Sequence, residues 1–435
     1  MSNAATHRPV TIRPMWVLLH RYAGLFMAGF LIVAALTGSI LAFDNELSDW
    51  LNPPPRVTAA GRTPLSPMEL RERALAIAPQ AQINSVLLSP KPERASLFTL
   101  ELREDSTTGE PIALPFNRLW LDPYSGAEVA HDSAPDSFWP LTRQNLIPFI
   151  VALHYKLALP GEFGVWLFGI AALLWTVDCF VGVYLTFPVR VRRSEVGEGI
   201  RPGPQHSWLA RWKPAWLVQW PVRSSYRLNI DLHRAGGLWP WVLALVLAWS
   251  SVGFNLYESV YLPVMQSVFG MTDSTAALPT FPVPKPEPGL SWREAHRLAQ
   301  QRMAEQAQAR GFSLLGEESL QYDPARSVFY YVARTDRDLS AESGGTVLIL
   351  NAVSGDMIDL SLPSGQNLGM TLHSWLFALH MATVWGVPYK VLLALAGIVI
   401  AVLCVTGLYL WWKKRRSRVV AAARRLVSTH TEAAQ

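Results

Sequence analysis

The chain has 435 residues, of which 50% are hydrophobic and only 16% are charged, and its formal net charge is +5. This balance is far from that of a soluble globular protein and indicates a membrane protein. Its two cysteines, Cys179 and Cys404, are too few for a disulfide framework, and their apolar sequence context favours a packing role. The sequence contains no glycine-rich nucleotide-binding motif.

Four apolar stretches are long enough to cross a bilayer as helices, which takes about 20 residues. They cover residues 16–43, 163–187, 238–261 and 389–412. The first stretch resembles a signal peptide, but its apolar core is too long and no convincing cleavage site follows it. We therefore expect it to be an uncleaved membrane anchor.

Basic residues flank these stretches on one side only, which sets the expected orientation in the membrane. They are Arg8 and Arg13 before the first stretch, Arg190, Arg192 and Arg193 after the second, Arg223, Arg227 and Arg234 before the third, and the run KKRRSR from Lys413 after the fourth. By the positive-inside rule, both termini and the loop 188–232 are cytoplasmic, and the two long segments lie outside. The positive charge therefore reflects topology and does not indicate nucleic-acid binding.

The two halves of the chain carry the same motifs in the same order. HRYAGL from His20 recurs as HRAGGL from His233, ALH at 152–154 recurs at 378–380, and GVYL from Gly182 recurs as GLYL from Gly407. Each half contains an apolar helix, an external segment and a second apolar helix. We therefore expect parallel repeats that are related by an axis along the membrane normal.

The external segments also match each other. Each begins with a serine that is followed three residues later by a glutamate, a capping-box signature, and each ends with two strand-like runs joined by a Ser-Gly turn. We predict an α-helical integral membrane protein, a pseudo-twofold bundle of four transmembrane helices with two small extracytoplasmic α+β domains. The expected parts are the N-terminus with helix one (1–43), the first external domain (44–145), a pre-helix with helix two (146–187), a cytoplasmic loop (188–232), helix three (233–261), the second external domain (262–372), a pre-helix with helix four (373–412) and a basic tail (413–435).

Five motifs occur together in this chain: HRxxGL at each first helix, LTG at 36–38, DPYSG at 122–126, LH before the second helix, and TGLYLWW at 406–412. In this combination the chain is similar to the PepSY-associated transmembrane protein family over nearly its whole length. The resemblance implies PepSY-like external domains that face the periplasm from a bacterial inner membrane. It also implies b-type haem in the membrane and outward electron delivery, since relatives of this kind include iron-regulated inner-membrane proteins and ferric-siderophore reductases.

Four of the ten histidines, His20, His154, His233 and His380, lie at or just before a predicted crossing. Titratable groups there are costly, so each is a candidate functional residue, although a lone histidine at this position is often a capping or snorkelling residue. The predicted topology pairs His20 with His233 near the cytoplasmic face and His154 with His380 near the outer face. Facing imidazoles are common axial ligands of haem iron, so we expect two haems b. His373 lies seven residues before His380 and is a competing ligand.

Residues near these histidines have secondary roles in this hypothesis. Gly24 and Gly237 lie one turn beyond His20 and His233 and could let a porphyrin approach the backbone, or could serve helix packing. Arg21 and Arg234 could bind haem propionates, or could serve only the positive-inside rule. Asp178, within the second apolar stretch, could hydrogen-bond a ligand histidine, relay a proton, or bond to a serine or threonine on another helix.

Two functions remain open from the sequence. The first is a dihaem oxidoreductase that passes electrons from the cytoplasmic side or the quinol pool to a periplasmic acceptor, which the resemblance suggests is a ferric siderophore. No flavin or nicotinamide domain is evident, so the donor would be quinol or a separate cytoplasmic reductase. The alternative is a non-redox PepSY binding or regulatory protein that restrains a periplasmic peptidase or senses an envelope ligand.

Overall fold

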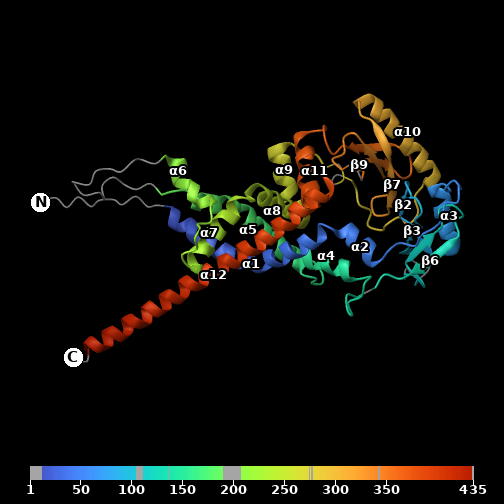
Figure 1. Ribbon diagram of the computed structural model, residues 1–435. Coiled ribbons are helices and arrows are strands. Elements are labelled where there is room, and N and C mark those ends of the chain that lie inside the picture. The colour runs from blue at the N-terminus through green and yellow to red at the C-terminus, as the bar shows by residue number, and fades with distance from the viewer. Residues whose placement is uncertain are drawn as a thin grey trace. The chain divides into compact units, whose positions relative to one another are not determined.

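The chain folds into two compact units in the computed structural model (Figure 1). The structure describes residues 12–103, 111–135, 137–189, 207–273, 275, 278–340 and 343–433, with side chains up to 422. Arg8, Arg190, Arg192 and Arg193 of the predicted basic flanks lie outside these residues. We call the first unit, Met1–Ala42 with Ile150–Val260 and Pro388–Gln435, the helical unit, and the second, Phe43–Phe149 with Tyr261–Val387, the sheet unit.

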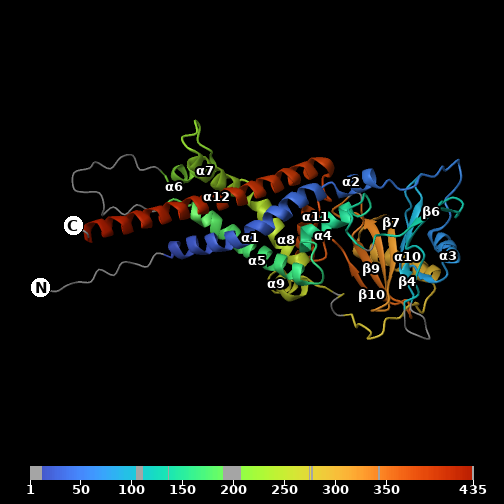
Figure 2. The ribbon, with the colours of Figure 1, turned by 90° about the horizontal axis from the view of Figure 1, so that it is seen from below.

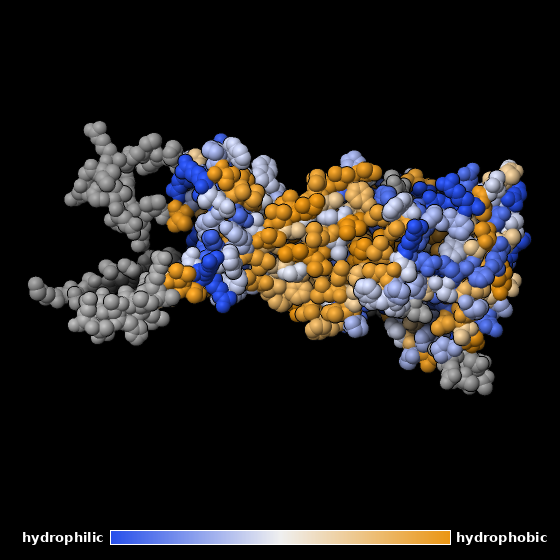
Figure 3. Space-filling model, turned by 60° about the horizontal axis from the view of Figure 1, so that its bottom comes forward, coloured by the Kyte–Doolittle hydropathy of each residue, from blue (hydrophilic) through white to orange (hydrophobic). Residues whose placement is uncertain are grey.

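The helical unit contains the long apolar helices that the sequence predicts. α1 (Arg13–Leu41), α5 (Phe163–Thr186) and α12 (Gly386–Ala433) are each long and apolar enough to cross a membrane. α5 packs against α1 and α8, and hydrophobic residues cover most of the helical surface seen in Figure 3. Apolar side chains that point outward suit a lipid environment, so the protein is a membrane protein with three or four candidate spans.

The predicted third span, residues 233–261, is not one straight helix. It consists of α7 (Ser225–Leu238) and α8 (Trp241–Asn255), which are bent by 67° relative to each other, followed by a π-helical turn at Tyr257–Tyr261 and α9 (Leu262–Phe269). The bend falls at Pro240, which has no backbone N–H to donate and whose ring disfavours a continuous helix. His233 therefore lies on α7, before the bend.

In each half, one short helix precedes the second spanning helix, as the proline and glycine residues predict. α4 (Leu146–Lys156) is separated from α5 by a break in which Leu157 and Ala158 have positive φ. α11 (Leu368–His380) is separated from α12 by a break in which Ala382 and Trp385 have positive φ. His154 lies on α4, and His380 ends α11. The remaining short helices are α2 (Asp44–Leu51), α6 (Trp208–Trp212) and the 3-10 helix Lys213–Trp216.

The sheet unit contains the predicted capped helices and hairpins. The Ser66 hydroxyl accepts the backbone N–H of Glu69 at the start of α3 (Pro67–Ile77), and that of Ser291 accepts the backbone N–H of Glu294 at the start of α10 (Trp292–Arg310). The hairpins are β5 (Arg118–Leu121) with β6 (Glu128–Asp132), and β9 (Thr346–Asn351) with β10 (Met357–Ser361). Gly126 and Gly355, at φ 71° and 75°, supply the left-handed residue of each turn.

Both external segments contribute to a single five-stranded sheet (Figure 2). Its order is β10-β9-β8-β7-β2, in which β2 (Ser85–Leu87) comes from the first segment and β7 (Leu314–Asp323) and β8 (Val328–Thr335) come from the second. Val86 pairs with Leu320 in the antiparallel β2–β7 ladder. β3 (Ser96–Thr99) forms a second sheet with β5 and β6, and β1 (Ala81–Gln82) pairs with β4 (Glu101–Leu102).

The two segments also share one hydrophobic core. Leu70 and Leu119 of the first segment belong to the same cluster as Leu320 and Leu348 of the second, and each is at most 2% exposed. The expected pair of small domains is thus a single folded unit, because neither segment alone encloses these side chains.

Candidate functional site

The rings of His20 and His233 lie side by side in the helical unit. His20 is on α1 and His233 is on α7, and their ring centroids are 6.0 Å apart with 62° between the ring planes. Both residues are partly buried. The structure thus brings together the first pair of histidines that the repeat singles out.

The Nδ1 of His20 is held by a carboxylate. Asp178 on α5 places its two oxygens 2.8 and 3.0 Å from this nitrogen. Asp178 is only 9% exposed, and in the described part of the chain its one ion pair is with His20. A carboxylate oxygen accepts hydrogen bonds, so the Nδ1–H of His20 donates to Asp178 and Nε2 takes no part in this contact.

The Nδ1 of His233 is held by α12 in a comparable way. The backbone carbonyl of Leu403 lies 3.1 Å from it and the Thr406 hydroxyl lies 3.2 Å from it. The Thr406 hydroxyl donates to the Leu403 carbonyl, so the carbonyl and the hydroxyl oxygen are both available as acceptors. His233 Nδ1–H therefore donates, and Nε2 again takes no part in the contact.

Two glycines lie against these rings at equivalent places in the repeat. A Cβ at Gly182 would lie 3.9 Å from His20 Cε1, and one at Gly407 would lie 3.1 Å from His233 Cε1. Both belong to a C-x-x-G-x-Y-L stretch, CFVGVYL from Cys179 or CVTGLYL from Cys404, for which the sequence suggests helix packing. The lack of a side chain at Gly407 thus leaves room for the His233 ring, whereas a methyl group at Gly182 would be in ordinary van der Waals contact with His20.

His154 is held by the LTG stretch of α1. Its Nδ1 lies 3.0 Å from the Thr37 hydroxyl, which donates to the Val33 carbonyl at 2.6 Å. A Cβ at Gly38 would lie only 2.9 Å from His154 Cε1. Thr37 accepts the Nδ1–H, as Asp178 does for His20, and sequence reasoning did not assign it this role.

The other two candidate ligands lie on α11 in the sheet unit. The Nδ1 of His373 lies 3.2 Å from the hydroxyl of the fully buried Tyr261, and its ring packs on Phe377 with centroids 4.3 Å apart. His380 is the last residue of the helix. The pairing of His154 with His380, and the choice between His380 and His373, stay predictions from the sequence.

Two arginines next to the His20–His233 pair have guanidinium groups that remain available. Arg21 and Arg234 are partly buried, and in the described part of the chain neither forms a hydrogen bond or an ion pair. No atom lies within 4 Å of a Cβ built on Gly24, whereas Leu403 Cδ1 lies 3.7 Å from one built on Gly237. A side chain at Gly24 would thus meet no protein atom within 4 Å, and the two arginines supply positive charge next in sequence to the histidines.

These residues fit the ligand set of a b-type haem. Imidazole nitrogens are common ligands of haem iron, and two neighbouring imidazoles would hold it together. The centroids of His20 and His233 are 6.0 Å apart. Both rings are held through Nδ1, so Nε2 is the nitrogen that would bind iron, and a guanidinium group matches the charge and fork geometry of a propionate. Among the described residues no group of three or more His, Cys, Asp or Glu side chains forms a metal site.

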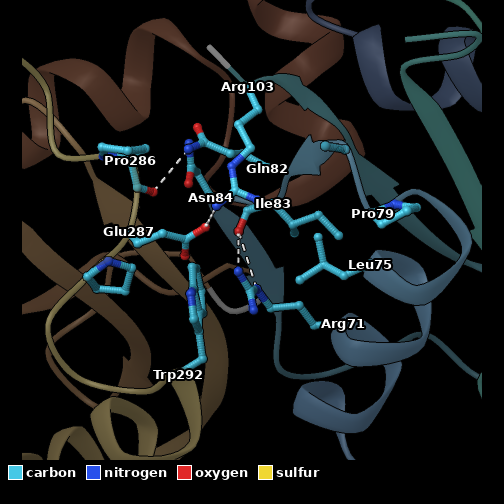
Figure 4. Close-up of a pocket in the computed structure, with 12 residues that line it drawn as sticks. Arg71, Leu75, Pro79, Gln82, Ile83, Asn84, Arg103, Pro286, Glu287 and Trp292 are labelled. Atoms are coloured by element: carbon cyan, nitrogen blue, oxygen red, sulfur yellow. Dashed lines mark hydrogen bonds and ion pairs between the residues drawn. The ribbon is translucent and has the colours of Figure 1, made fainter. Parts of the chain in front are cut away.

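The sheet unit contains a separate polar cavity of about 180 Å³ (Figure 4). Arg71 stacks on Trp292 at 4.1 Å and donates to the Ile83 carbonyl, and Arg103 pairs with Glu287 at 2.8 Å. Burial lowers the pKa of Arg71 to about 10, although Glu287 and Glu72 act to raise it. The cavity is smaller than most small-molecule sites. Its lining residues are Arg71, Leu75, Pro79, Ala81, Gln82, Ile83, Asn84, Arg103, Pro286, Glu287, Pro288 and Trp292.

Fold and site together define a membrane protein with three or four candidate spans and a histidine pair inside its helical unit. The sequence model of the PepSY-associated TM region matches residues 17–414, and the chain belongs to this family. The resemblance seen in the sequence is therefore confirmed. A comparison with curated proteins finds no match.

Proposed function

We propose that the protein carries electrons across a membrane through two b-type haems. His20 and His233 would hold the first haem through their Nε2 atoms. The observation that carries the proposal is the 6.0 Å centroid separation of two rings whose Nδ1 atoms are both hydrogen-bonded to the protein. A haem so ligated supplies one-electron chemistry, and the chain supplies ligation, spacing and exclusion of water.

His154 and His380 would hold the second haem, with His373 as the competing ligand. The proposal rests on the ALH repeat and on the Thr37 hydrogen bond, which turns the Nδ1 of His154 toward α1. Arg21 and Arg234 would bind the propionates of the first haem, because both residues are partly buried and each follows a ligand histidine in the sequence.

The direction and the partners of the electron transfer follow from the basic flanks and from the family. The termini would be cytoplasmic in a bacterial inner membrane, and the sheet unit would be periplasmic. Quinol or a cytoplasmic reductase would donate electrons, and a ferric siderophore would accept one electron per iron. Reduction of Fe(III) to Fe(II) weakens its binding by a hard-oxygen chelator, which would release iron for uptake.

An absorption spectrum of the purified chain tests the proposal directly. We expect a Soret band, visible bands that sharpen on dithionite reduction, and about two haems per chain. His20→Ala and His154→Ala should each lose one haem, whereas His131→Ala, an exposed site in the sheet unit, should lose none. Colourless protein from haem-replete cells would refute the proposal and favour a binding or regulatory role.

The substrate needs a separate assay. Vesicles that contain the protein and an internal reductant should reduce an external ferric chelate, and the rate should fall in the histidine variants. A rate that does not depend on His20 or His154 would exclude ferric-chelate reduction by this route.

A further inference from the structure

The two halves hold His20 and His233 from equivalent positions with different chemistry. Asp178 and Leu403 each precede the cysteine of the C-x-x-G-x-Y-L stretch, and each contacts the Nδ1 of the histidine in its own half. In one half the acceptor is a side-chain carboxylate, and in the other it is a backbone carbonyl. The repeat is therefore preserved in geometry and broken in charge.

The charge of Asp178 acts on His20 with little competition. Its side chain is 10% exposed, both oxygens lie within 3.0 Å of Nδ1, and the described residues give it no lysine or arginine partner. A buried carboxylate without a cation is costly, and water screens it poorly. The hydrogen bonds of Asp178 in the described part of the chain are both with the Nδ1 of His20.

We propose that Asp178 is a positioning residue that makes His20 a stronger donor than His233 and lowers the midpoint potential of the haem between them. The inference rests on the proposed function. A carboxylate that accepts the Nδ1–H raises the basicity of the ring, and a more basic axial ligand stabilises Fe(III) over Fe(II). The neutral carbonyl of Leu403 does this to a smaller extent at His233.

The acceptor beside His154 differs from Asp178 in charge. The Nδ1 of His154 lies 3.0 Å from the Thr37 hydroxyl, which carries no charge. A haem held by His154 would lack the stabilisation of Fe(III) that Asp178 supplies through His20, and on this count it would have the higher potential of the two.

Spectroelectrochemical titration of the full-length protein tests the inference. Asp178→Asn removes the charge at constant shape, and Asp178→Leu copies the residue of the second half. Both should shift the lower of the two midpoint potentials upward and leave the higher one unchanged, and Asp178→Glu should restore part of the shift. Thr176→Val is the matched control, since this hydroxyl on α5 bonds only to the Ala172 carbonyl among the described residues.

Several outcomes would overturn the inference. The first is an unshifted potential in Asp178→Asn protein that keeps both haems, and the second is an equal shift in Thr176→Val. If the Asp178 variants lose haem, the titration is repeated on His20→Ala protein. The inference requires that this variant lose the haem of lower potential and retain the haem of higher potential, and loss of the other haem would overturn it. A colourless wild type would refute the proposed function itself, whereas a coloured wild type without these shifts would refute only the role of Asp178.

Discussion

Replacing Gly24 with alanine gives a direct test for a group bound beside His20. Gly24 lies four residues after His20 on α1, so the two share one face of the helix, one turn apart. No protein atom lies within 4 Å of a Cβ built at Gly24. A methyl group there meets nothing in the protein, so any effect on haem content must come from contact with the haem.

Gly24→Ala should be stabilising in the haem-free protein and destabilising in the haem-bound protein. Without haem, alanine is the better helix former, and Gly24→Ala should stabilise α1 by about 0.5–1 kcal/mol. With haem, the added methyl group overpacks the face of the macrocycle at a cost of about 1–3 kcal/mol. That cost corresponds to a roughly five- to 150-fold loss of haem affinity.

Haem per chain and thermal unfolding of the haem-free protein are the two measurements. Gly29→Ala is the matched control, because Gly29 also lies on α1 with no atom within 4 Å of its Cβ position. We expect the control to retain haem and Gly24→Ala to lose one of the two. Full retention of both haems in Gly24→Ala, at haem concentrations near the dissociation constant, would refute a porphyrin at this face.

Other predictions follow from the same geometry. A methyl group at Gly38 would lie 2.9 Å from His154 Cε1, whereas one at Gly182 would lie 3.9 Å from His20 Cε1, so Gly38→Ala should deplete the second haem and Gly182→Ala should deplete neither; the reverse order in a pigment assay would contradict this. In the sheet unit, burial acts to raise the pKa of Glu317, but hydrogen bonds from His296 and Tyr331 lower it by more. The net result is a pKa below the ordinary value. This stabilisation is present above the unfolded pKa and is lost as the pH falls through the folded pKa, so thermal stability should drop below about pH 4.5, with a flatter profile in Glu317→Gln; identical profiles would exclude Glu317 as the cause. Leu320→Ala should lower the free energy of unfolding by about 2–5 kcal/mol and should speed amide hydrogen exchange at Val86, the residue of the other segment that pairs with Leu320 in the sheet. Unchanged exchange at Val86 would argue against a shared core.

Local patterns predicted much of the helical unit and of the sheet-unit elements. Apolar length located α1, α5 and α12, and the capping serines Ser66 and Ser291 located the starts of α3 and α10. These features depend on neighbouring residues, which the sequence displays directly. The meeting of His20 and His233 was predicted from the repeated HRxxGL motif and the expected topology, which put both histidines near the same face of the membrane.

Features that depend on long-range contacts were not predicted. The β2–β7 ladder joins two strands that are more than 200 residues apart, and β2 has only three residues, so no local pattern distinguishes it. The hydrogen bond from His233 to the Leu403 carbonyl is also invisible in the sequence, because every residue carries that carbonyl. The bend before α8 required knowing that Pro240 ends one helix, where the sequence showed a continuous apolar run.

The fusion of the two halves into one polypeptide has a consequence for what each can become. In a homodimer of a single half, the antiparallel pairing seen between β2 and β7 would join identical surfaces, and the same residue would stand at both positions now held by Asp178 and Leu403. Any charge placed beside one histidine would then be copied beside the other. In a single chain that contains both halves, a substitution beside one histidine leaves the equivalent position beside the other histidine unchanged. The two sites can therefore acquire different properties independently.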